Sequence, residues 1–268
     1  MATATNTTPA AERAATTPGG AASVSTATFR IWRGERNQGA YSDFATPVDE
    51  GMVVLDAVHR IQAQQAPDLA VRWNCKAGKC GSCSAEINGQ PKLMCMTRLN
   101  QLDLTKPVTI EPMRTFPHVK DLVTDVSWNY EVKQRIRPFH LRPPDADGER
   151  RAYQKDVDRP QEFRKCIECF LCQDVCHVLR EHHLHPAFIG PRFLIHVAQM
   201  EMNPLDDGDR LDQLKDDFGI GYCNITKCCT KVCPEGITIT DNGIIPLKER
   251  VVDRFYDPLA KLFRVFSS

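Results

Sequence analysis

The sequence has no excess of charge of either sign and no long apolar run. Its 268 residues include 34 lysines and arginines and 34 aspartates and glutamates, so the formal net charge is zero. Nucleic-acid binding normally requires a basic surface, and this balance argues against a nucleic-acid partner. A membrane-spanning helix needs about 18 or more consecutive apolar residues. Because no such run occurs, we do not expect this chain to cross a membrane by itself.

Two sequence signals are also missing. Residues 1–26 are rich in Ala, Thr, Pro and Gly and lack the apolar stretch of an export signal. They are predicted to form a disordered extension, because they cannot bury enough surface to offset their ordering entropy. There is no Gly-rich nucleotide-binding fingerprint, and no acid–base set stands out. We therefore expect this chain to bind neither a dinucleotide nor a substrate, and its many thiols to stay in a reducing compartment.

The twelve cysteines fall into three groups of four, and their spacing is the most informative feature of the sequence. The first group follows C-x4-C-x2-C with a distant fourth cysteine, the plant-type [2Fe–2S] pattern. The second follows C-x2-C-x2-C-x3-C, the bacterial cubane pattern, in which the fourth cysteine serves a different cluster. The groups are Cys75, Cys80, Cys83 and Cys95; Cys166, Cys169, Cys172 and Cys176; and Cys223, Cys228, Cys229 and Cys233. Two unrelated iron–sulfur signatures on one chain indicate electron transfer.

The third group departs from the cubane spacing at one position. A repeat of the second group would place cysteine at 226, where the sequence has Thr226. A hydroxyl is a poor ligand for iron–sulfur clusters, which are held by thiolates, so a [3Fe–4S] cluster is predicted. In the competing interpretation Cys228 supplies a fourth thiolate. Adjacent cysteines usually point apart, so we expect Cys228 to face away from the cluster that Cys229 binds and to pack as a small buried side chain.

Small residues accompany the first group. Gly78, Gly81 and Gly89 let the backbone approach a cluster closely, and Ser82 and Ser84 are expected to add hydroxyl donors. Disulfides are disfavoured, because they typify small secreted chains. Zinc is disfavoured, because zinc ribbons use two separate pairs of cysteines.

The periodicity predicts two domains. Alternation over residues 28–33 and short apolar segments at 84–88 and 106–113 predict strands, while helical spacing predicts an amphipathic helix over 51–64. A compact α+β domain is therefore expected over residues 27–135.

The remainder is predicted to be helical. Residues 136–160 are rich in Pro and charge and are the best linker candidate. An α-helical domain is expected over 161–268. Pro191 is placed to open one helix, with apolar residues at 193, 194, 197 and 198, and Gly219 to end another, with apolar residues at 211, 214 and 218.

The chain resembles the iron–sulfur subunit of succinate dehydrogenase or fumarate reductase, in particular its actinobacterial branch, from about residue 28 to 255. The resemblance is carried by RWNCKAGKCGSCSAEINGQPKLMC, RKCIECFLCQDVC, GYCNITKCCTKVCPEGI and their order. It implies an N-terminal β-grasp plant-type ferredoxin domain followed by an all-α helical ferredoxin domain. It also implies a FAD-bearing flavoprotein subunit, one or more membrane-anchor subunits with quinone nearby, and peripheral attachment to the cytoplasmic face of the plasma membrane.

The resemblance also implies which cysteines bind each cluster. The [2Fe–2S] ligands would be Cys75, Cys80, Cys83 and Cys95; the [4Fe–4S] ligands Cys166, Cys169, Cys172 and Cys233; and the [3Fe–4S] ligands Cys176, Cys223 and Cys229. Cys228 is left over. The quinone-site residues of the family do not carry over, because His177 follows Cys176 where proline is usual, Arg180 and Glu181 stand where tryptophan is expected, and Asn224 stands where histidine is common.

Other features have a structural and a functional interpretation. His182, His183 and His185 are candidates for quinone contact or proton relay, but a solvated or partner-facing loop is the simpler interpretation. The apolar residues at 251, 255, 259, 262, 263 and 266 recur near helical spacing. They either rest on a membrane surface or anchor subunit or pack on their own domain.

Three functional classes remain open. The first is the electron-transfer subunit of a succinate:quinone-type complex, which the resemblance favours. The second is the iron–sulfur subunit of another flavoprotein oxidoreductase. The third is a freestanding ferredoxin-like carrier, which would usually be smaller and strongly acidic, unlike this neutral chain.

Overall fold

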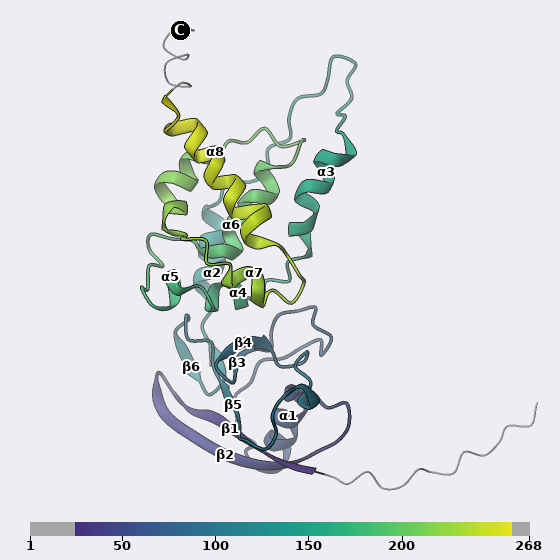
Figure 1. Cartoon of the computed structure of the whole chain (residues 1–268), viewed down its shortest axis with the longest axis vertical. Helices are drawn as coiled ribbons and strands as arrows, with labels where there is room; N and C mark the ends of the chain where they lie inside the picture. Colours follow the sequence, from purple (N-terminus) through teal and green to yellow (C-terminus); the bar gives the residue numbers. More distant parts are fainter. Residues whose placement is uncertain (1–24, 259–268) are drawn as a thin grey trace, which may run out of the picture.

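The computed structural model describes residues 25–258, which form a sheet-based half and a helical half stacked end to end (Figure 1). The strands are β1 Ser25–Glu35, β2 Gln38–Val48, β3 Ser84–Ile87, β4 Gln90–Leu93, β5 Val108–Glu111, β6 His118–Lys120 and β7 Val123–Thr124. The helices are α1 Val54–Gln64, α2 Ser127–Arg135, α3 Gln154–Gln161, α4 Leu171–Asp174, α5 His177–Arg180, α6 Gly190–Glu201, α7 Cys228–Val232 and α8 Ile245–Phe255.

The N-terminal half is one mixed sheet that curls around α1 (Figure 1). The sheet runs β4-β3-β5-β1-β6-β7, with β2 paired to β1, and β1 is parallel to β5 but antiparallel to β2. The apolar stripe of α1 packs on it, because Leu55, Val58 and Ile61 share a buried core with Phe29 and Ile31 of β1. The predicted helix over 51–64 and the predicted β-grasp domain are confirmed.

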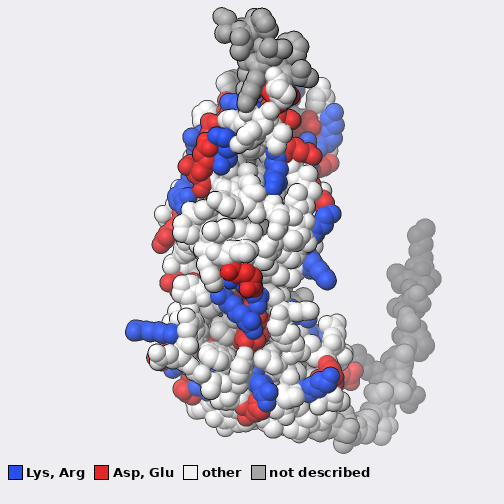
Figure 2. Space-filling view, turned by 60° about the vertical axis from the view of Figure 1, so that its left-hand side comes forward, with Lys and Arg blue, Asp and Glu red and all other residues white. Residues whose placement is uncertain are grey.

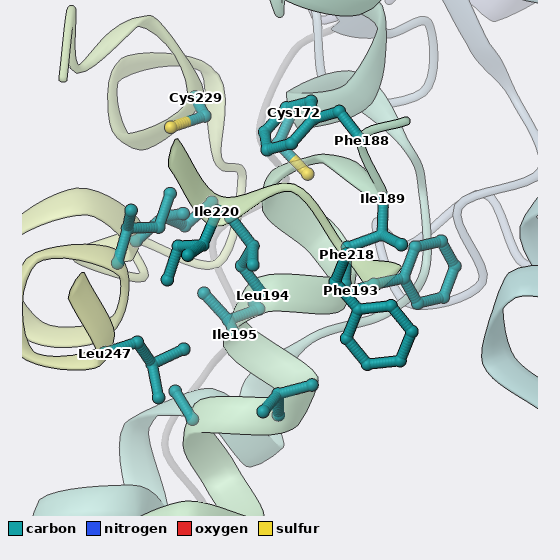
Figure 3. Packing of buried hydrophobic residues seen from close by; sticks show 14 of the residues in the cluster. Cys172, Phe188, Ile189, Phe193, Leu194, Ile195, Phe218, Ile220, Cys229 and Leu247 are labelled. Atoms are coloured by element: carbon teal, nitrogen blue, oxygen red, sulfur yellow. The ribbon is translucent and has the colours of Figure 1, made fainter. Parts of the chain in front are cut away.

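The helical half is organised around α6. Pro191 lies in the first turn of α6, and Phe193, Leu194, Val197 and Ala198 are buried, as the sequence predicts. All four share a buried core with Phe188, Ile189, Phe218 and Leu247. Figure 3 shows Phe193 and Leu194 within this core, with Cys172 and Cys229 at its edge.

The segment before Gly219 is helical but short. It includes a π-helical turn, Gln213–Asp217, after which Gly219 takes the left-handed conformation with φ +59°. The predicted end of this helix is therefore confirmed. Just before this segment, Arg210 is fully buried and pairs with Glu201, the last residue of α6, and with Asp206, which ties the segment to α6.

The structure places some boundaries differently from the sequence. Strand β1 begins at Ser25, within the predicted extension, while residues 1–24 lie outside the described part of the chain. The residues of helix α2 fall within the predicted first domain, while Val132 of this helix packs in the core of the helical half. The predicted linker, 136–160, includes most of α3, and its Arg137 amide donates to the Gln213 side chain. The early start of β1 follows from its pairing with β2, where Ser25 lies opposite Val48. The other two differences follow from packing within the helical half, which sequence periodicity does not reveal.

The C-terminal apolar stretch is described only in part. Val251 is buried and Phe255 packs against the helical core, so the part of the stretch on α8 packs on its own domain. Residues 259, 262, 263 and 266 lie outside the described residues. Within residues 25–258, no helix combines the length and the apolar character that crossing a bilayer would require. Acidic and basic side chains are interspersed over the face shown in Figure 2.

Candidate metal centres

The first cysteine group lies on an irregular loop between α1 and β3. Lys76 and Gly78 have positive φ, +53° and +67°, which turns successive amides inward. The backbone N–H groups of Ala77 and Lys79 both donate to the Cys75 Sγ at 3.3 Å. The amide of Cys95 donates to the Cys83 Sγ at 3.5 Å, which joins the distant fourth cysteine to the loop.

The electrostatic surroundings of these thiols differ. Burial raises the pKa of Cys83 to about 12, with the nearby thiols of Cys95 and Cys80 adding to the shift. Partial burial also acts to raise the pKa of Cys80, but hydrogen bonds from Ser82 and Cys75 outweigh it and lower the pKa to about 6. The lowered pKa of Cys80 agrees with the predicted donor role of Ser82. Ser84 behaves differently, because its hydroxyl bonds to backbone carbonyls and not to sulfur.

The second site draws its thiols from both ends of the helical half. Cys166, Cys169, Cys172 and Cys233 line one cavity, together with Arg192 and a set of apolar side chains. Burial raises the pKa of Cys169 to about 12 and that of Cys172 well above its ordinary value. In such an apolar pocket the thiols would stay neutral as long as no metal is bound. A bound metal deprotonates a coordinating thiol outright, so the pocket fits a metal cluster.

The third site interleaves with the second. Cys176, which follows the three thiols of the second cavity in sequence, lines a separate cavity with Cys223 and Cys229. Burial raises the pKa of Cys176 to about 12 and that of Cys229 to about 11. The Thr240 hydroxyl lies 3.4 Å from the Cys229 Sγ. The sequence did not single out Thr240, because nothing in its local pattern marks it.

The backbone of the third group repeats that of the second. Glu168 and Phe170 have positive φ, +54° and +61°, two and four residues after Cys166. Ile225 and Lys227 have φ of +60° and +61°, at the same offsets from Cys223. A short helix follows each loop, α4 and α7 respectively. Thr226 therefore stands in the third loop where Cys169 stands in the second, as the sequence comparison of the two groups predicts.

The expectation that Cys228 packs as a buried side chain is wrong. Its side chain is half-buried and not fully buried, and its Sγ lies 3.3 Å from the Thr226 Oγ1. Cys228 lines the third cavity and also a larger groove between α7 and β4. Because α7 begins at Cys228 at the border of the two halves, the residue is partly open to that groove instead of enclosed by the core.

The histidines divide between packing and surface roles. The His185 ring packs edge-to-face on Trp128 at 4.7 Å, and burial lowers its pKa. His182 and His183 are exposed. The structure also brings His177 to Asn224, with 2.8 Å between the His177 Nε2 and the Asn224 Nδ2. Both are positions at which the sequence departs from the family pattern, and both line the third cavity.

The two halves meet through polar contacts around the cysteine groups. The Thr115 amide donates to the Asp174 Oδ1 at 3.1 Å, and the Thr115 hydroxyl to the Asp174 carbonyl oxygen at 3.0 Å. The fully buried carboxylate of Glu86 on β3 pairs with Arg180 of α5 at 3.0 Å. These contacts keep β3 and the segment after β5 against α4 and α5.

The donor sets suit multi-iron clusters. Among residues 25–258, no three or more His, Cys, Asp or Glu side chains are placed to hold a single metal ion. The thiols instead line two cavities and one loop, with backbone amides beside sulfur in the loop and a hydroxyl beside sulfur in the third site. Thiolates held in this way are the ligands of iron–sulfur clusters, whose potentials depend on such hydrogen bonds and on burial.

Comparisons with known proteins agree with this chemistry. A model of the 2Fe-2S iron-sulfur cluster binding domain matches residues 28–131, and one of the 4Fe-4S dicluster domain matches residues 162–237. The chain is 35% identical to the fumarate reductase iron-sulfur subunit of Mycobacterium tuberculosis, over 74% of this chain and 80% of the relative. It is 30% identical to the succinate dehydrogenase iron-sulfur subunit of Paracoccus denitrificans, over 76% and 78% respectively.

A solved structure also resembles this chain. A chain of the Mycobacterium smegmatis Sdh1 complex in the apo form is 58% identical to this one and superposes with a TM-score of 0.84. The match covers 88% of this chain and 99% of the other. The similarity therefore extends over both halves of the fold and all three cysteine groups.

Proposed function

The chain belongs to the family of succinate dehydrogenase and fumarate reductase iron–sulfur subunits, and we propose that it passes electrons between the flavin of a partner subunit and quinone at a membrane-anchor subunit. It is the electron-transfer part of an oxidoreductase, and the same wiring serves succinate oxidation and fumarate reduction. The clusters, when bound, would supply one-electron chemistry. The chain's own residues would hold them and set the hydrogen bonds and burial around them.

The observation that carries the proposal is the interleaving of the two cavities. Cys233 joins the second group although it lies more than sixty residues along the chain, while Cys176 leaves that group to join the third. This exchange is the pattern of two-cluster ferredoxins. It supports a chain of centres that begins at the loop of Cys75 and ends at the cavity of Cys223.

The ligand sets we propose follow these groupings. The [2Fe–2S] cluster is assigned to Cys75, Cys80, Cys83 and Cys95; the [4Fe–4S] cluster to Cys166, Cys169, Cys172 and Cys233; and the [3Fe–4S] cluster to Cys176, Cys223 and Cys229. The third assignment is supported by Thr226, which stands where the loop of the second group has Cys169.

The partners follow from family membership. We infer a FAD-bearing subunit next to the first site, where the Cys75 thiol is exposed beside the half-exposed rings of Trp73. We infer one or more membrane-anchor subunits near the third site, which would attach the chain peripherally to the cytoplasmic face of the plasma membrane. Tyr222 and Ile225 are exposed apolar side chains next to Cys223, as such a contact would require.

Low-temperature EPR of the purified complex tests this proposal. The oxidised complex is expected to show the [3Fe–4S] signal, and reduction with succinate and then with dithionite is expected to reveal the signals of the other two clusters. The complex is also expected to reduce quinone with succinate as the donor. A complex that contains the clusters but is reduced only by a different donor would identify the iron–sulfur subunit of another flavoprotein oxidoreductase. Recovery of the chain without a flavin-bearing subunit would instead favour a freestanding carrier.

A further inference from the structure

The first cysteine loop touches the second cysteine group directly at Gly81. A Cβ atom placed on Gly81 would lie 2.6 Å from the Cys169 Cα and 2.9 Å from the Cys169 N and Cβ. Side chains do not tolerate such distances, so only glycine allows the two backbones to come this close. Gly81 also has φ +69°, a conformation that favours glycine.

A buried hydroxyl strengthens the same contact. The Ser84 Oγ lies 2.8 Å from the carbonyl oxygen of Cys169 and 2.9 Å from that of Gly81. A serine hydroxyl has one proton to donate, so the two carbonyls share it. Ser84 and Cys169 are only 7% and 8% exposed, which keeps competing water away from this hydrogen bond.

Gly81 and Ser84 are sequence neighbours of proposed cluster ligands. Gly81 directly follows Cys80, and Ser84 directly follows Cys83, so each is one peptide bond from a proposed ligand of the first centre. Both meet the backbone of Cys169, a proposed ligand of the second centre. The contact therefore links ligands of the two centres through bonded atoms, one hydrogen bond and one van der Waals contact.

The other contact of this loop with the helical half lies at the surface. The Lys79 Nζ is 3.1 Å from the Glu235 Oε1, but the lysine side chain is 69% exposed. An exposed ion pair holds its geometry weakly. It is a poor candidate for fixing the separation of two redox centres, and Lys79 therefore provides a control.

We propose that Gly81 and Ser84 are positioning residues for electron transfer between the first and second centres, and that electrons enter the second centre at Cys169. The inference rests on the proposed function. One electron moves at a time, so that the first centre is oxidised by one electron and the second is reduced by one. No bond forms or breaks and no proton moves. Electron tunnelling weakens steeply with separation, so a small displacement of this contact slows the transfer.

Gly81→Ala in the complete complex tests the contact, with Gly89→Ala as its matched control. Gly89 has φ +71°, close to that of Gly81, but a Cβ placed on it would meet nothing within 4 Å. Both variants place alanine at a position with positive φ, but only Gly81→Ala places a Cβ against Cys169. Rapid freeze-quench EPR after a pulse of succinate would follow electron loss from the first centre.

Gly81→Ala is expected to slow this step several-fold relative to Gly89→Ala, while the midpoint potentials of both centres stay unchanged. The EPR signal of the first centre is also expected to saturate at lower microwave power when the second centre is reduced, because their magnetic coupling weakens. Equal rates and equal saturation in the two variants would overturn the inference.

Ser84→Ala provides a second, milder test that decides the matter if Gly81→Ala does not assemble the second centre. The hydroxyl bonds to carbonyls and not to sulfur, so its loss is expected to slow transfer while leaving the potentials unchanged. Lys79→Ala is expected to transfer at the normal rate. A normal rate in Ser84→Ala would reject the inference. Iron and sulfide analysis separates this from failure of the proposed function, in which the clusters themselves would be missing.

Discussion

Backbone conformation at single residues shapes the surroundings of each thiol. Positive φ at Lys76 and Gly78 directs two amides onto the Cys75 sulfur. Positive φ at Ile225 and Lys227 shapes the third loop in the same way as the corresponding residues of the second. Non-glycine residues rarely adopt this conformation. Its recurrence beside the cysteines indicates that the surrounding fold imposes it, as is common at functional sites.

The remaining cysteine gives a prediction at the residue scale. Cys228→Ala is expected to leave the EPR signal of an oxidised [3Fe–4S] centre intact, because Cys228 is half-buried and its thiol contacts the Thr226 hydroxyl. Its effect on stability should be small, within about 0.5 kcal/mol, as for most substitutions that bury no new group. Cys229→Ala, at the adjacent buried position, is expected to abolish the signal. If the native protein lacked the signal and the Cys228→Ala variant showed it, Cys228 would be a fourth ligand.

At the scale of elements, short helices connect the cysteine loops to the core. Helix α4 begins directly after Phe170, and α7 begins directly after Lys227. Each of these two preceding residues has the left-handed backbone conformation. Helices of four or five residues are not stable alone, so their geometry depends on packing against α6 and on the clusters. The connections between helices also need the left-handed conformation, and glycine supplies it where neighbouring atoms leave no room for a Cβ atom.

The turn at Gly219 gives a prediction at this scale. A Cβ atom on Gly219 would lie 1.9 Å from the Ala187 carbonyl oxygen, and the residue has φ +59°. Gly219→Ala is therefore expected to lower the thermal midpoint more than Gly148→Ala, which has φ +86° but no atom within 4 Å of the added Cβ. The left-handed conformation alone costs roughly 1–2 kcal/mol, and the control measures that part. Equal midpoints by calorimetry would mean that the turn relaxes freely.

At the scale of the whole molecule, the two halves share their cores at the border. Cys169 and Leu171 of the second cysteine group pack in the core of the sheet-based half. Met113 and Phe116, which follow β5, pack in the core of the helical half. These shared contacts therefore fix the position of the two halves relative to each other. Each cysteine site still takes its thiols from one half only.

This arrangement predicts how the sites respond to loss of a ligand. Cys80→Ser is expected to impair the [2Fe–2S] signal and leave the other two clusters largely assembled, because all four thiols of the first site lie in the sheet-based half. Cys233→Ser is expected to disturb the helical half, because Cys233 closes the second cavity from the far end of the chain. EPR and iron content measure both effects. Equal loss of all clusters in the two variants would contradict independent assembly.

Much of this protein is determined by short-range sequence. Cysteine spacing alone indicates the three sites, because a two-residue gap lets thiolates converge from one loop whatever the rest of the chain does. The helical spacing before Gln64 and the proline at the start of α6 likewise act within a few residues. These predictions needed no knowledge of distant contacts, and the structure confirms both helices.

The tertiary structure decided what depends on distant segments. Helix α2 belongs to the helical core because Val132 packs against residues far along the chain. Cys228 is half-exposed because α7 begins at the border of the two halves, although its local pattern suggested burial. The Ser84 hydroxyl bonds to the Cys169 carbonyl across 85 positions of sequence. Periodicity reports which side chains are apolar, but which surfaces meet is decided only when the whole chain packs.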